Sequence, residues 1–460
     1  MPDGVGLRNF AFTSFVEIGE QMGWEVVFWN QTPFDLKELG FTEIKLTGKP
    51  RAFTDLLKRT KISAELDYFE EKFNDPVYKT YKFPPSRKSL KAKIKNALVD
   101  QMTTTYRGEK GMEKLRKKIK NSERKSAIYH HCKEVLKREK PDLIFCTNQR
   151  PVNAIAPLTA AQDLKIPTAS FIFSWDNLPK ATLVVDPDFY FVWSKHMKKE
   201  LLDYYPFLNK EQVFVTGSPQ FEPHFDQTLL INRKKFFEEN NLDSAKDYIC
   251  FSGDDSTTSP DDPQYLNDVA EAVSKLNEKE HYNLGIIFRR CPVDFSKRYD
   301  KTIEKYNGLI IPIAPKWKKM GENWNEILPT KEDLRLQINS IFHTKAVINL
   351  GSSMVFDFAV FNKPCLYLNY NVPNRENKKW SSQRVYDFVH FRSMPTKDVV
   401  VWANSKEELE KKLIVLIENQ FRTVVNAKKW FQRIMEQPAN KASERIWIEC
   451  ENIITPDYGN

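Results

Sequence analysis

The sequence predicts an α/β protein made of two consecutive Rossmann-like domains, each with a parallel sheet covered by helices on both faces. Short apolar runs rich in β-branched and aromatic residues alternate with longer charged segments of helical periodicity along most of the 460 residues. The runs are continuous, whereas strands with one solvated face would alternate apolar and polar residues. They fall into two series, each long enough for one domain of about 200 residues.

The first series begins with a Gly-rich turn that no strand precedes. Asp3-Gly4-Val5-Gly6 is followed by a predicted helix at 10–22. Such a turn normally follows the first strand of a Rossmann-like domain, so we expect this strand to be a stub or the natural product to start further upstream. The later predicted strands are WEVVFW (24–29), FTEIKL (41–46), DLIFCT (142–147), TASFIF (168–173), FYFVWS (189–194) and QVFVTG (212–217).

The second series follows Gly217-Ser218-Pro219, which suits a hinge because Gly permits unusual φ values and Pro restricts φ. Its predicted strands are YICFSG (248–253), LGIIFR (284–289), LIIPI (309–313), AVINLG (346–351), CLYLN (365–369) and VVVWA (399–403). The expected domains are therefore 1–216 and 217–430. A C-terminal helix within 431–460 is expected to pack back on the first domain.

A basic region covers residues 79–138, with 19 Lys and Arg against 5 Asp and Glu. Its periodicity predicts a helical insertion in the first domain. Three interpretations stay open: a solvated helical face, a surface for anionic lipid or a phosphate-bearing acceptor, and a nucleic-acid surface. Leu90, Ile94 and Leu98 recur at helical spacing between lysines, which suits the first two. No nucleic-acid-binding motif supports the third, so no nucleic-acid partner is expected.

The remaining composition predicts a cytoplasmic protein, peripheral at the inner face of the membrane if the basic region binds lipid. No window of 18 uncharged apolar residues is present, and the N-terminus lacks the pattern of a secretory signal. The six cysteines form no CxxC pair, which predicts reduced thiols. No metal or cofactor is expected: the histidines lack HxxxH spacing, and Asp186-Pro187-Asp188 suits a turn before a strand.

Polar residues follow four predicted strands of the second domain. They lie in the segments 253–258, 289–292, 314–317 and 351–353. Because ligands of open parallel sheets bind beyond the carboxyl ends of the strands, these segments are expected to meet at one crevice. The candidate ligand-binding residues are Gly253, Asp254, Arg289, Gly351, Ser352, Ser353 and Asp357.

The segment around Ser353 predicts an anion site. Ser353 stands at the N-cap position of a helix expected over 354–361, where free N–H groups and the helix dipole favour an anion. The hydroxyls of Ser352 and Ser353 add two donors, and Arg289 offers a fork of donors for a diphosphate. Asp357, one turn into the helix, could accept hydrogen bonds from a ribose diol. Taken alone, the same residues also fit an ordinary capped helix.

With VTGSPQFE (215–222), IIFRRCP (286–292) and INLGSSMVFDFAVFNKPCLYLN (348–369) in this order, residues 200–440 resemble the donor domain of a GT-B glycosyltransferase. The pattern also resembles CDP-glycerol glycerophosphotransferases and UDP-N-acetylglucosamine 2-epimerases. SWDNLPKA (174–181) resembles a segment of bacterial surface-polysaccharide transferases of this group. The resemblance implies two domains facing a central cleft, a metal-independent reaction and a nucleotide-sugar co-substrate, most simply UDP-linked. Many relatives carry Glu where this chain carries Asp357, and the shorter side chain puts the ribose contact in question.

An inverting transfer needs a base near the acceptor hydroxyl. Two first-domain acids are candidates: Asp3 in the Gly-rich turn, where the resemblance places a base, and Asp176 at the end of a strand. Turn formation or N-capping would also explain both. Gly4, Gly6, Trp175 and Asn177 are the candidate acceptor-binding residues.

The function expected from these features is transfer of a sugar from a nucleotide-diphosphate donor to a glycan or lipid-linked acceptor in cell-surface polysaccharide synthesis. Two other enzyme activities use the same donor site: polyol-phosphate transfer of the CDP-glycerol type and epimerisation of a UDP-sugar. The alternative that is not an enzyme is a nucleotide-sugar sensor. The region of Pro315 and Trp317 is expected to recognise the base, although a core-capping role fits Trp317 equally well.

Overall fold

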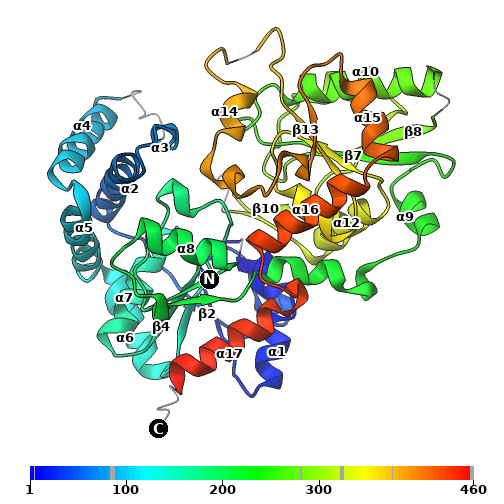
Figure 1. Cartoon of the computed structure of the whole chain (residues 1–460). Helices are drawn as coiled ribbons and strands as arrows, with labels where there is room; N and C mark the ends of the chain where they lie inside the picture. Colours follow the sequence, from blue (N-terminus) through cyan, green and yellow to red (C-terminus); the bar gives the residue numbers. More distant parts are fainter. Residues whose placement is uncertain (5, 83–88, 280–281, 322–325, 376, 456–460) are drawn as a thin grey trace. The chain divides into compact units, whose positions relative to one another are not determined.

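A computed structural model describes residues 1–4, 6–82, 89–279, 282–321, 326–375 and 377–455 (Figure 1). The chain divides into two compact units: unit 1 comprises residues 1–219 and 434–460, and unit 2 comprises residues 220–433. Each unit holds a parallel sheet with helices packed against it. The prediction of an α/β protein with two parallel sheets is therefore confirmed.

Unit 1 contains a four-stranded parallel sheet in the order β3-β4-β5-β6 and a separate parallel pair, β1-β2. The strands are β1 (Phe28–Asn30), β2 (Glu43–Lys45), β3 (Ile144–Cys146), β4 (Thr168–Phe171), β5 (Phe189–Val192) and β6 (Val213–Val215). Only the end of the predicted strand at 24–29 lies in β1, and residues 24–27 are irregular.

Helices of unit 1 from distant parts of the sequence pack on one another. The C-terminal helix α17 contacts α1, because the Trp447 ring stacks on Phe15 at 4.8 Å and its Nε1 donates to the Phe15 carbonyl (Figure 1). The α-helices of unit 1 are α1 (Phe15–Gln21), α2 (Ala52–Phe73), α3 (Val77–Thr80), α4 (Leu90–Thr105), α5 (Gly108–Glu123), α6 (Ala127–Glu139), α7 (Ile155–Asp163), α8 (Lys195–Tyr204) and α17 (Ala442–Ile454).

The basic region is helical where the structure describes it, and residues 83–88 within it lie outside the described residues. Helices α4 and α5 both pack on α2. Ser89 and Ser126 begin α4 and α6, and each hydroxyl accepts a hydrogen bond from a first-turn N–H. Some of the basic side chains form ion pairs within unit 1, since Arg116 and Lys120 both pair with Asp186.

Unit 2 contains a six-stranded parallel sheet in the order β14-β13-β12-β7-β8-β9. Its strands are β7 (Asp247–Ser252), β8 (Leu284–Arg289), β9 (Ile310–Pro312), β12 (Val347–Asn349), β13 (Cys365–Leu368) and β14 (Val401–Ala403). All residues of β8, β12 and β13 are buried, as the continuous apolar runs predict for a parallel sheet. A short antiparallel hairpin joins β10 (Lys318–Lys319) and β11 (Ile327–Leu328).

The helices of unit 2 alternate with these strands. They are α9 (Arg233–Glu239), α10 (Asp262–Lys279), α11 (Asp300–Lys305), α12 (Lys331–Phe342), α13 (Met354–Val360), α14 (Ser382–Tyr386), α15 (Leu409–Glu418) and α16 (Phe421–Ile434), the last of which crosses the boundary between the units. Among the described residues, no helix has both the length and the apolar character needed to cross a bilayer. All six cysteines are unpaired.

Candidate functional site

The carboxyl ends of four adjacent strands of unit 2 form one edge of its sheet. Since β12, β7, β8 and β9 are neighbours in this order, their following turns lie in a row. Adjacent strands are about 4.8 Å apart, so the ends of β12 and β8 lie roughly 10 Å apart. The sheet order thus brings Gly351, Gly253 and Arg289 to the same edge.

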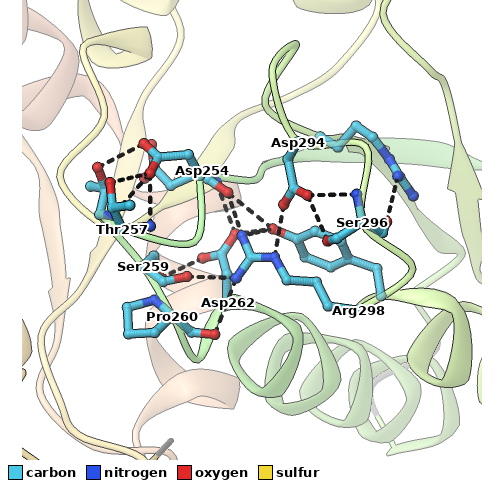
Figure 2. A network of polar contacts seen from close by, with 12 residues as sticks. Asp254, Thr257, Ser259, Pro260, Asp262, Asp294, Ser296 and Arg298 are labelled. Atoms are coloured by element: carbon cyan, nitrogen blue, oxygen red, sulfur yellow. Dashed lines mark hydrogen bonds and ion pairs between the residues drawn. The ribbon is translucent and has the colours of Figure 1, made fainter. Parts of the chain in front are cut away.

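Gly253 follows β7 at a point where no side chain would fit. A Cβ atom there would lie 2.9 Å from the Tyr299 hydroxyl and 3.1 Å from Oδ2 of Asp262. Figure 2 shows the polar network that fills this space. The Tyr299 hydroxyl donates to Asp262 Oδ2 at 2.7 Å, and the same oxygen accepts the main-chain N–H of Asp254 at 2.9 Å. These hydrogen bonds fix the turn that follows β7.

Arg298 anchors this loop from the opposite side (Figure 2). Its guanidinium donates to the carbonyl oxygens of Asp254, Ser259 and Pro260, and its Nε donates to Asp294 at 2.7 Å. A single arginine therefore holds both ends of the loop 254–260. Ser259 and Asp262 are linked by a further hydrogen bond of 2.9 Å.

Two carboxyl groups of the network have raised pKa values. Burial raises the pKa of Asp262 to about 6. Burial raises the pKa of Asp254 as well, and the nearby carboxylates of Asp262 and Asp255 raise it further. Oδ2 of Asp254 is shielded from solvent and has no hydrogen-bond partner among the described residues. Proton uptake by this pair would relieve the repulsion between the two acids.

Arg289, the last residue of β8, is a buried cation. Its Nη2 donates to Oδ1 of Asp333 at 3.1 Å, and the two side chains are 8% and 4% exposed. Its Nη1 is buried and has no hydrogen-bond partner among the described residues. A buried donor left without a partner costs free energy, so Nη1 is available to an anionic ligand.

A pocket of about 210 Å³ lies beyond the carboxyl ends of β8 and β9. Phe288, Arg290, Pro315 and Trp317 are among the residues that line it. The indole N–H of Trp317 donates to Oδ2 of Asp333 at 2.7 Å, which fixes the ring. The pocket combines apolar walls, a cation and a fixed aromatic ring, and it has room for a planar heterocycle.

Asp333 ties this pocket to Arg289. Besides Trp317, it accepts the main-chain N–H of Lys316 at 2.8 Å, and its own N–H bonds to the side chain of Thr330, the N-cap of α12. One carboxylate at the start of α12 therefore orients both the turn after β9 and the guanidinium at the end of β8.

The turn after β12 contains a glycine in the left-handed region of backbone conformation. Gly351 has a φ of +74°, and a Cβ atom there would lie 3.0 Å from Val385, so only glycine fits without strain. The N–H of Ser352 is held by Asn349 Oδ1 at 2.8 Å. Ser353 is the N-cap of α13, but its hydroxyl caps no helix N–H, and the side chain is exposed.

Asp357, the candidate ribose contact, is buried in α13 and pairs with a histidine. Its Oδ1 lies 2.8 Å from Nε2 of His224, and the two side chains are 9% and 1% exposed. Nδ1 of His224 is buried and has no partner among the described residues. One oxygen of Asp357 is therefore already engaged, so a ribose contact would fall to the other.

In unit 1, Asp3 is also buried. Its Oδ2 accepts a hydrogen bond of 2.6 Å from Nδ2 of Asn148, which follows β3. Gly4 is buried, and its carbonyl accepts the N–H of Leu7 at 3.2 Å. A Cβ atom at Gly6 would lie 2.7 Å from Oγ1 of Thr147. The Gly-rich turn is thus packed against the residues after β3, and Val5 within it lies outside the described residues.

Asp176 lies after β4 and is surrounded by donors. Ser174 Oγ and Asn177 Nδ2 donate to its Oδ1 at 2.6 and 2.9 Å, and Lys180 pairs with its Oδ2. To act as a base, Asp176 would have to exchange one of these donors for the acceptor hydroxyl. Trp175 and Asn177 are 7% and 2% exposed, so the fold covers most of each side chain. Asn177 accepts a hydrogen bond from Gln149 at 3.0 Å.

Asp186 and Asp188, the acids of the DxD sequence, are both engaged within unit 1. Arg116 and Lys120 pair with Asp186, and the side chain of Asp188 accepts from Thr168 Oγ1 at 2.7 Å. Over the part of the chain that the structure describes, no cluster of three or more metal-ligating side chains occurs.

No protein-family model matches the sequence, and no curated protein matches it. The structure is similar to a putative UDP-N-acetylglucosamine 2-epimerase from Listeria monocytogenes, with a TM-score of 0.46 at 14% identity over 70% of this chain and 78% of that one. It is similar to MnaA from S. aureus in a UDP co-structure, with a TM-score of 0.46 at 14% identity over 88% and 96% of the two chains. The wall teichoic acid polymerase TagF has a TM-score of 0.42 at 13% identity over 69% and 73%.

Sequence reasoning missed three residues of these sites: His224, Asp333 and Asn148. A signal existed for Asp333, since Thr330-Lys331-Glu332-Asp333 has the pattern of a helix start. Asn148 was visible as the polar end of an apolar run. No local pattern points to His224, because its partner lies 133 positions away.

Proposed function

We propose that unit 2 binds a nucleotide-diphosphate-activated donor at the edge formed by β12, β7, β8 and β9. The observation that carries this proposal is the buried guanidinium of Arg289, whose Nη1 has no partner among the described residues and which ends β8, beside the turn of Gly253 and two strands away from the turn of Gly351. Arginine presents a planar fork of donors that matches phosphate oxygens. The free hydroxyl of Ser353 supplies a further donor to the same anion.

The pocket beyond β8 and β9 supports a nucleotide rather than a simple phosphate as the ligand. At about 210 Å³ it is large enough for a base but not for a sugar nucleotide as a whole. Trp317 offers a ring face, and Asp333 links that ring to Arg289. In this arrangement the base lies over β9, the diphosphate beside β8 and β12, and the ribose toward Asp357.

We propose that the reaction is glycosyl transfer to a glycan or lipid-linked acceptor, without a metal and with inversion. Asp3 is the preferred base, with Asp176 as the alternative, because Asp3 lies in the Gly-rich turn, where the resemblance places a base. The leaving diphosphate would be stabilised by Arg289 and by the hydroxyl of Ser353. Polyol-phosphate transfer and epimerisation would use the same donor site.

Nucleotide binding is the experiment that tests the donor site. We expect UDP or a UDP-sugar to raise Tm and to bind in isothermal titration, with CDP and GDP compounds as comparisons. Arg289→Ala and Ser353→Ala should each weaken binding. Ser126→Ala is the matched control: its hydroxyl caps α6, so its loss should cost about 1 kcal/mol of stability and leave binding unchanged. Equal affinity of wild type and Arg289→Ala would contradict the proposal.

Product analysis with a panel of donors separates transfer from epimerisation and from polyol-phosphate transfer. Asp3→Asn and Asp176→Asn test the base, with nucleotide affinity as the measure that each variant still folds. A base variant should lose turnover and keep the affinity of unit 2. If both variants retain full turnover, neither acid is the base. If every donor binds and none reacts, the sensor alternative is favoured.

We propose an anionic membrane surface as the partner of α4. Leu90, Ile94 and Leu98 lie one turn apart and are 75%, 55% and 44% exposed, with the exposed side chains of Lys91 and Lys93 beside them. An apolar stripe next to lysines is the pattern of a helix that lies in a membrane interface. The other side of α4 packs on α2, where Lys95 pairs with Asp55 at 2.8 Å.

Liposome sedimentation tests this surface. The protein should bind vesicles that contain anionic lipid and not neutral ones. A double variant, Leu90→Ser with Ile94→Ser, should reduce binding, whereas Phe421→Ser, which removes an 82% exposed apolar side chain from unit 2, should not. Equal binding to neutral and anionic vesicles, or none to either, would exclude the role.

A further inference from the structure

Arg150 is a cation without a charged partner at the carboxyl edge of the unit 1 sheet. It belongs to the turn after β3, and the turn after the adjacent strand β4 contains another cation, Lys180. Lys180 pairs with Asp176, whereas the guanidinium of Arg150 forms no ion pair and no hydrogen bond with a described residue. Ligands of parallel sheets bind beyond the carboxyl ends of the strands, so this guanidinium lies where a ligand is expected.

An aromatic ring holds the Arg150 side chain in place. The central carbon of the guanidinium lies 5.4 Å from the centroid of the Phe173 ring, which is within the range of a cation–π contact. This contact satisfies none of the five N–H donors that an arginine carries. Arg150 is half-buried, so solvent and ligands reach its donors. The side chain is therefore positioned by the ring while its hydrogen-bonding capacity stays open.

The buried side chain of Gln149 fixes the backbone on both sides of this contact. Its Nε2 donates to Oδ1 of Asn177 at 3.0 Å, and its Oε1 accepts the N–H of Phe173 at 3.0 Å. Its carbonyl accepts the N–H of Val184 at 3.1 Å. The residue before Arg150 and the ring against which Arg150 lies are thus bonded to each other. A site that is ordered before its ligand arrives loses less conformational entropy on binding.

Asn148 connects Arg150 to the proposed base. Its Oδ1 accepts the main-chain N–H of Arg150 at 3.0 Å, and its Nδ2 donates to Oδ2 of Asp3 at 2.6 Å. One buried amide therefore joins the two residues, yet Asp3 and Arg150 form no ion pair with each other. The charge of Arg150 is not neutralised by the acid, and it lies close to the position that an acceptor hydroxyl would take.

We propose that Arg150 binds an oxyanion of the acceptor, a phosphate or a carboxylate, next to the hydroxyl that Asp3 deprotonates. The guanidinium fork matches two oxygens of either group. A neutral glycan would give this positioned cation no partner of opposite charge. The inference rests on the proposed function and names the chemical class of its acceptor.

Arg150 has a binding role in this reaction and takes no part in bond formation. The acceptor oxygen bonds to the anomeric carbon of the donor, and the bond from that carbon to the diphosphate breaks. The hydroxyl proton passes to the carboxylate of Asp3. The oxyanion held by Arg150 is unchanged, so the contact serves to select and orient the acceptor.

Arginine modification tests the site without knowledge of the whole acceptor. Phenylglyoxal reacts with accessible guanidinium groups, and peptide mass mapping reads each arginine separately. Glycerol phosphate, glycerate and glycerol are the probes, because they share one carbon skeleton and differ in the anionic group. We expect an anionic probe to slow the modification of Arg150 several-fold. Arg107, which is exposed and bonds to no described side chain, is the control and should react at an unchanged rate.

Substitution of Arg150 checks the same contact by titration calorimetry, with unit 2 saturated by UDP. Arg150→Gln should weaken binding of the anionic probe about tenfold or more, the range for loss of a hydrogen bond to a charged group. Arg150→Lys should bind between wild type and Arg150→Gln, because it keeps the charge and loses the fork. Arg107→Gln should bind the probe like wild type. Tm shows whether each variant is folded.

The probes also identify the source of the oxyanion. Protection of Arg150 by glycerol phosphate alone supports a phosphate, protection by glycerate alone supports a carboxylate, and protection by both supports the shared chemistry. Equal protection by neutral glycerol, no protection by either anion, or unchanged probe affinity of Arg150→Gln would overturn the proposal. Failure of the donor site would be a separate result, seen as absence of UDP binding, because the reactivity of Arg150 is read without nucleotide.

Discussion

Nε2 of His224 lies 2.8 Å from Oδ1 of Asp357, and both side chains are buried within unit 2. His224 comes from the segment that opens unit 2, and Asp357 lies one turn into α13. The pair therefore connects the start of the unit to the helix whose N-terminus is the candidate anion site. It also sets the direction of the carboxylate that we propose for the ribose.

His224→Gln should destabilise the protein by about 1–3 kcal/mol, because it disturbs the partner of a buried carboxylate. If Asp357 binds ribose, the same change should weaken nucleotide binding as well. His343→Gln is the matched control, since the partner of His343 is a backbone carbonyl, that of Ile231 at 2.8 Å. Urea unfolding and titration calorimetry measure both effects. Equal free energies of unfolding for wild type and His224→Gln would show that the pair of His224 and Asp357 does not stabilise the fold.

Asp333→Asn should weaken nucleotide binding about tenfold or more, because the carboxylate holds Arg289 and the turn at Lys316 and Trp317 together. Loss of a charged hydrogen-bond acceptor from such a group costs about 1.5–3 kcal/mol. The fluorescence of Trp317 should change in the same variant. Asp247→Asn, at an exposed ion pair of 3.3 Å with Lys345, is the control and should leave affinity unaltered.

Gly351→Ala should cost more stability than Gly308→Ala. Both residues have a positive φ, +74° and +77°, so each alanine carries the cost of the left-handed region, about 1–2 kcal/mol. Only at Gly351 does the added Cβ meet neighbours, at 3.0 Å from Val385, whereas at Gly308 nothing lies within 4 Å. The difference between the two free energies of unfolding isolates the packing contribution. A difference of zero would mean that the turn after β12 relaxes freely.

Stability should depend on the protonation of Asp262. Its folded pKa is about 6, above the ordinary value of 3.8, so the folded state binds more protons than the unfolded state between these values. The contribution is complete below pH 4 and is lost as pH rises through 6, and it amounts to about 3 kcal/mol. Asp262→Asn should remove this loss, which urea unfolding at pH 4 and pH 7 would detect.

Asp163→Asn is the control for the pH experiment. Arg124 lowers the pKa of Asp163 to about 2, so this carboxylate is ionised in both states above pH 5 and contributes little to the difference between pH 4 and pH 7. The variant should resemble wild type in that interval. If Asp262→Asn also resembles wild type, then Asp262 does not titrate in the predicted window.

The prediction of strands succeeded where a run is buried on both faces. LGIIFR (284–289) is predicted and found over the same residues, because a central parallel strand needs apolar side chains throughout. The run at 24–29 fails in part, since only Phe28 and Trp29 of it enter β1. Apolar character cannot form a strand by itself, because a strand needs a partner, and residues 24–27 pair with no strand among the described residues.

The sequence predicted the residues of the turns in the candidate site. It did not predict which other side chains these residues contact. Sequence alone indicated the turn at Gly351 and the helix start at Ser353, because both are local features, although the Ser353 hydroxyl caps no helix N–H. The sequence also named Arg289, because it ends a strand of the second series. What Arg289 and Asp357 contact was not visible, since Asp333 and His224 lie 44 and 133 positions away.

The sequence by itself determined the two α/β series, the positions of most strands and the polar turns at their carboxyl ends. Hydrophobic periodicity and the residue preferences of turns depend on residues a few positions apart, so both can be recognised in the sequence. The tertiary structure decided which carboxylates are engaged and which buried donors lack a partner among the described residues. Those properties depend on burial and on contacts between distant residues, and only the folded chain brings such residues together.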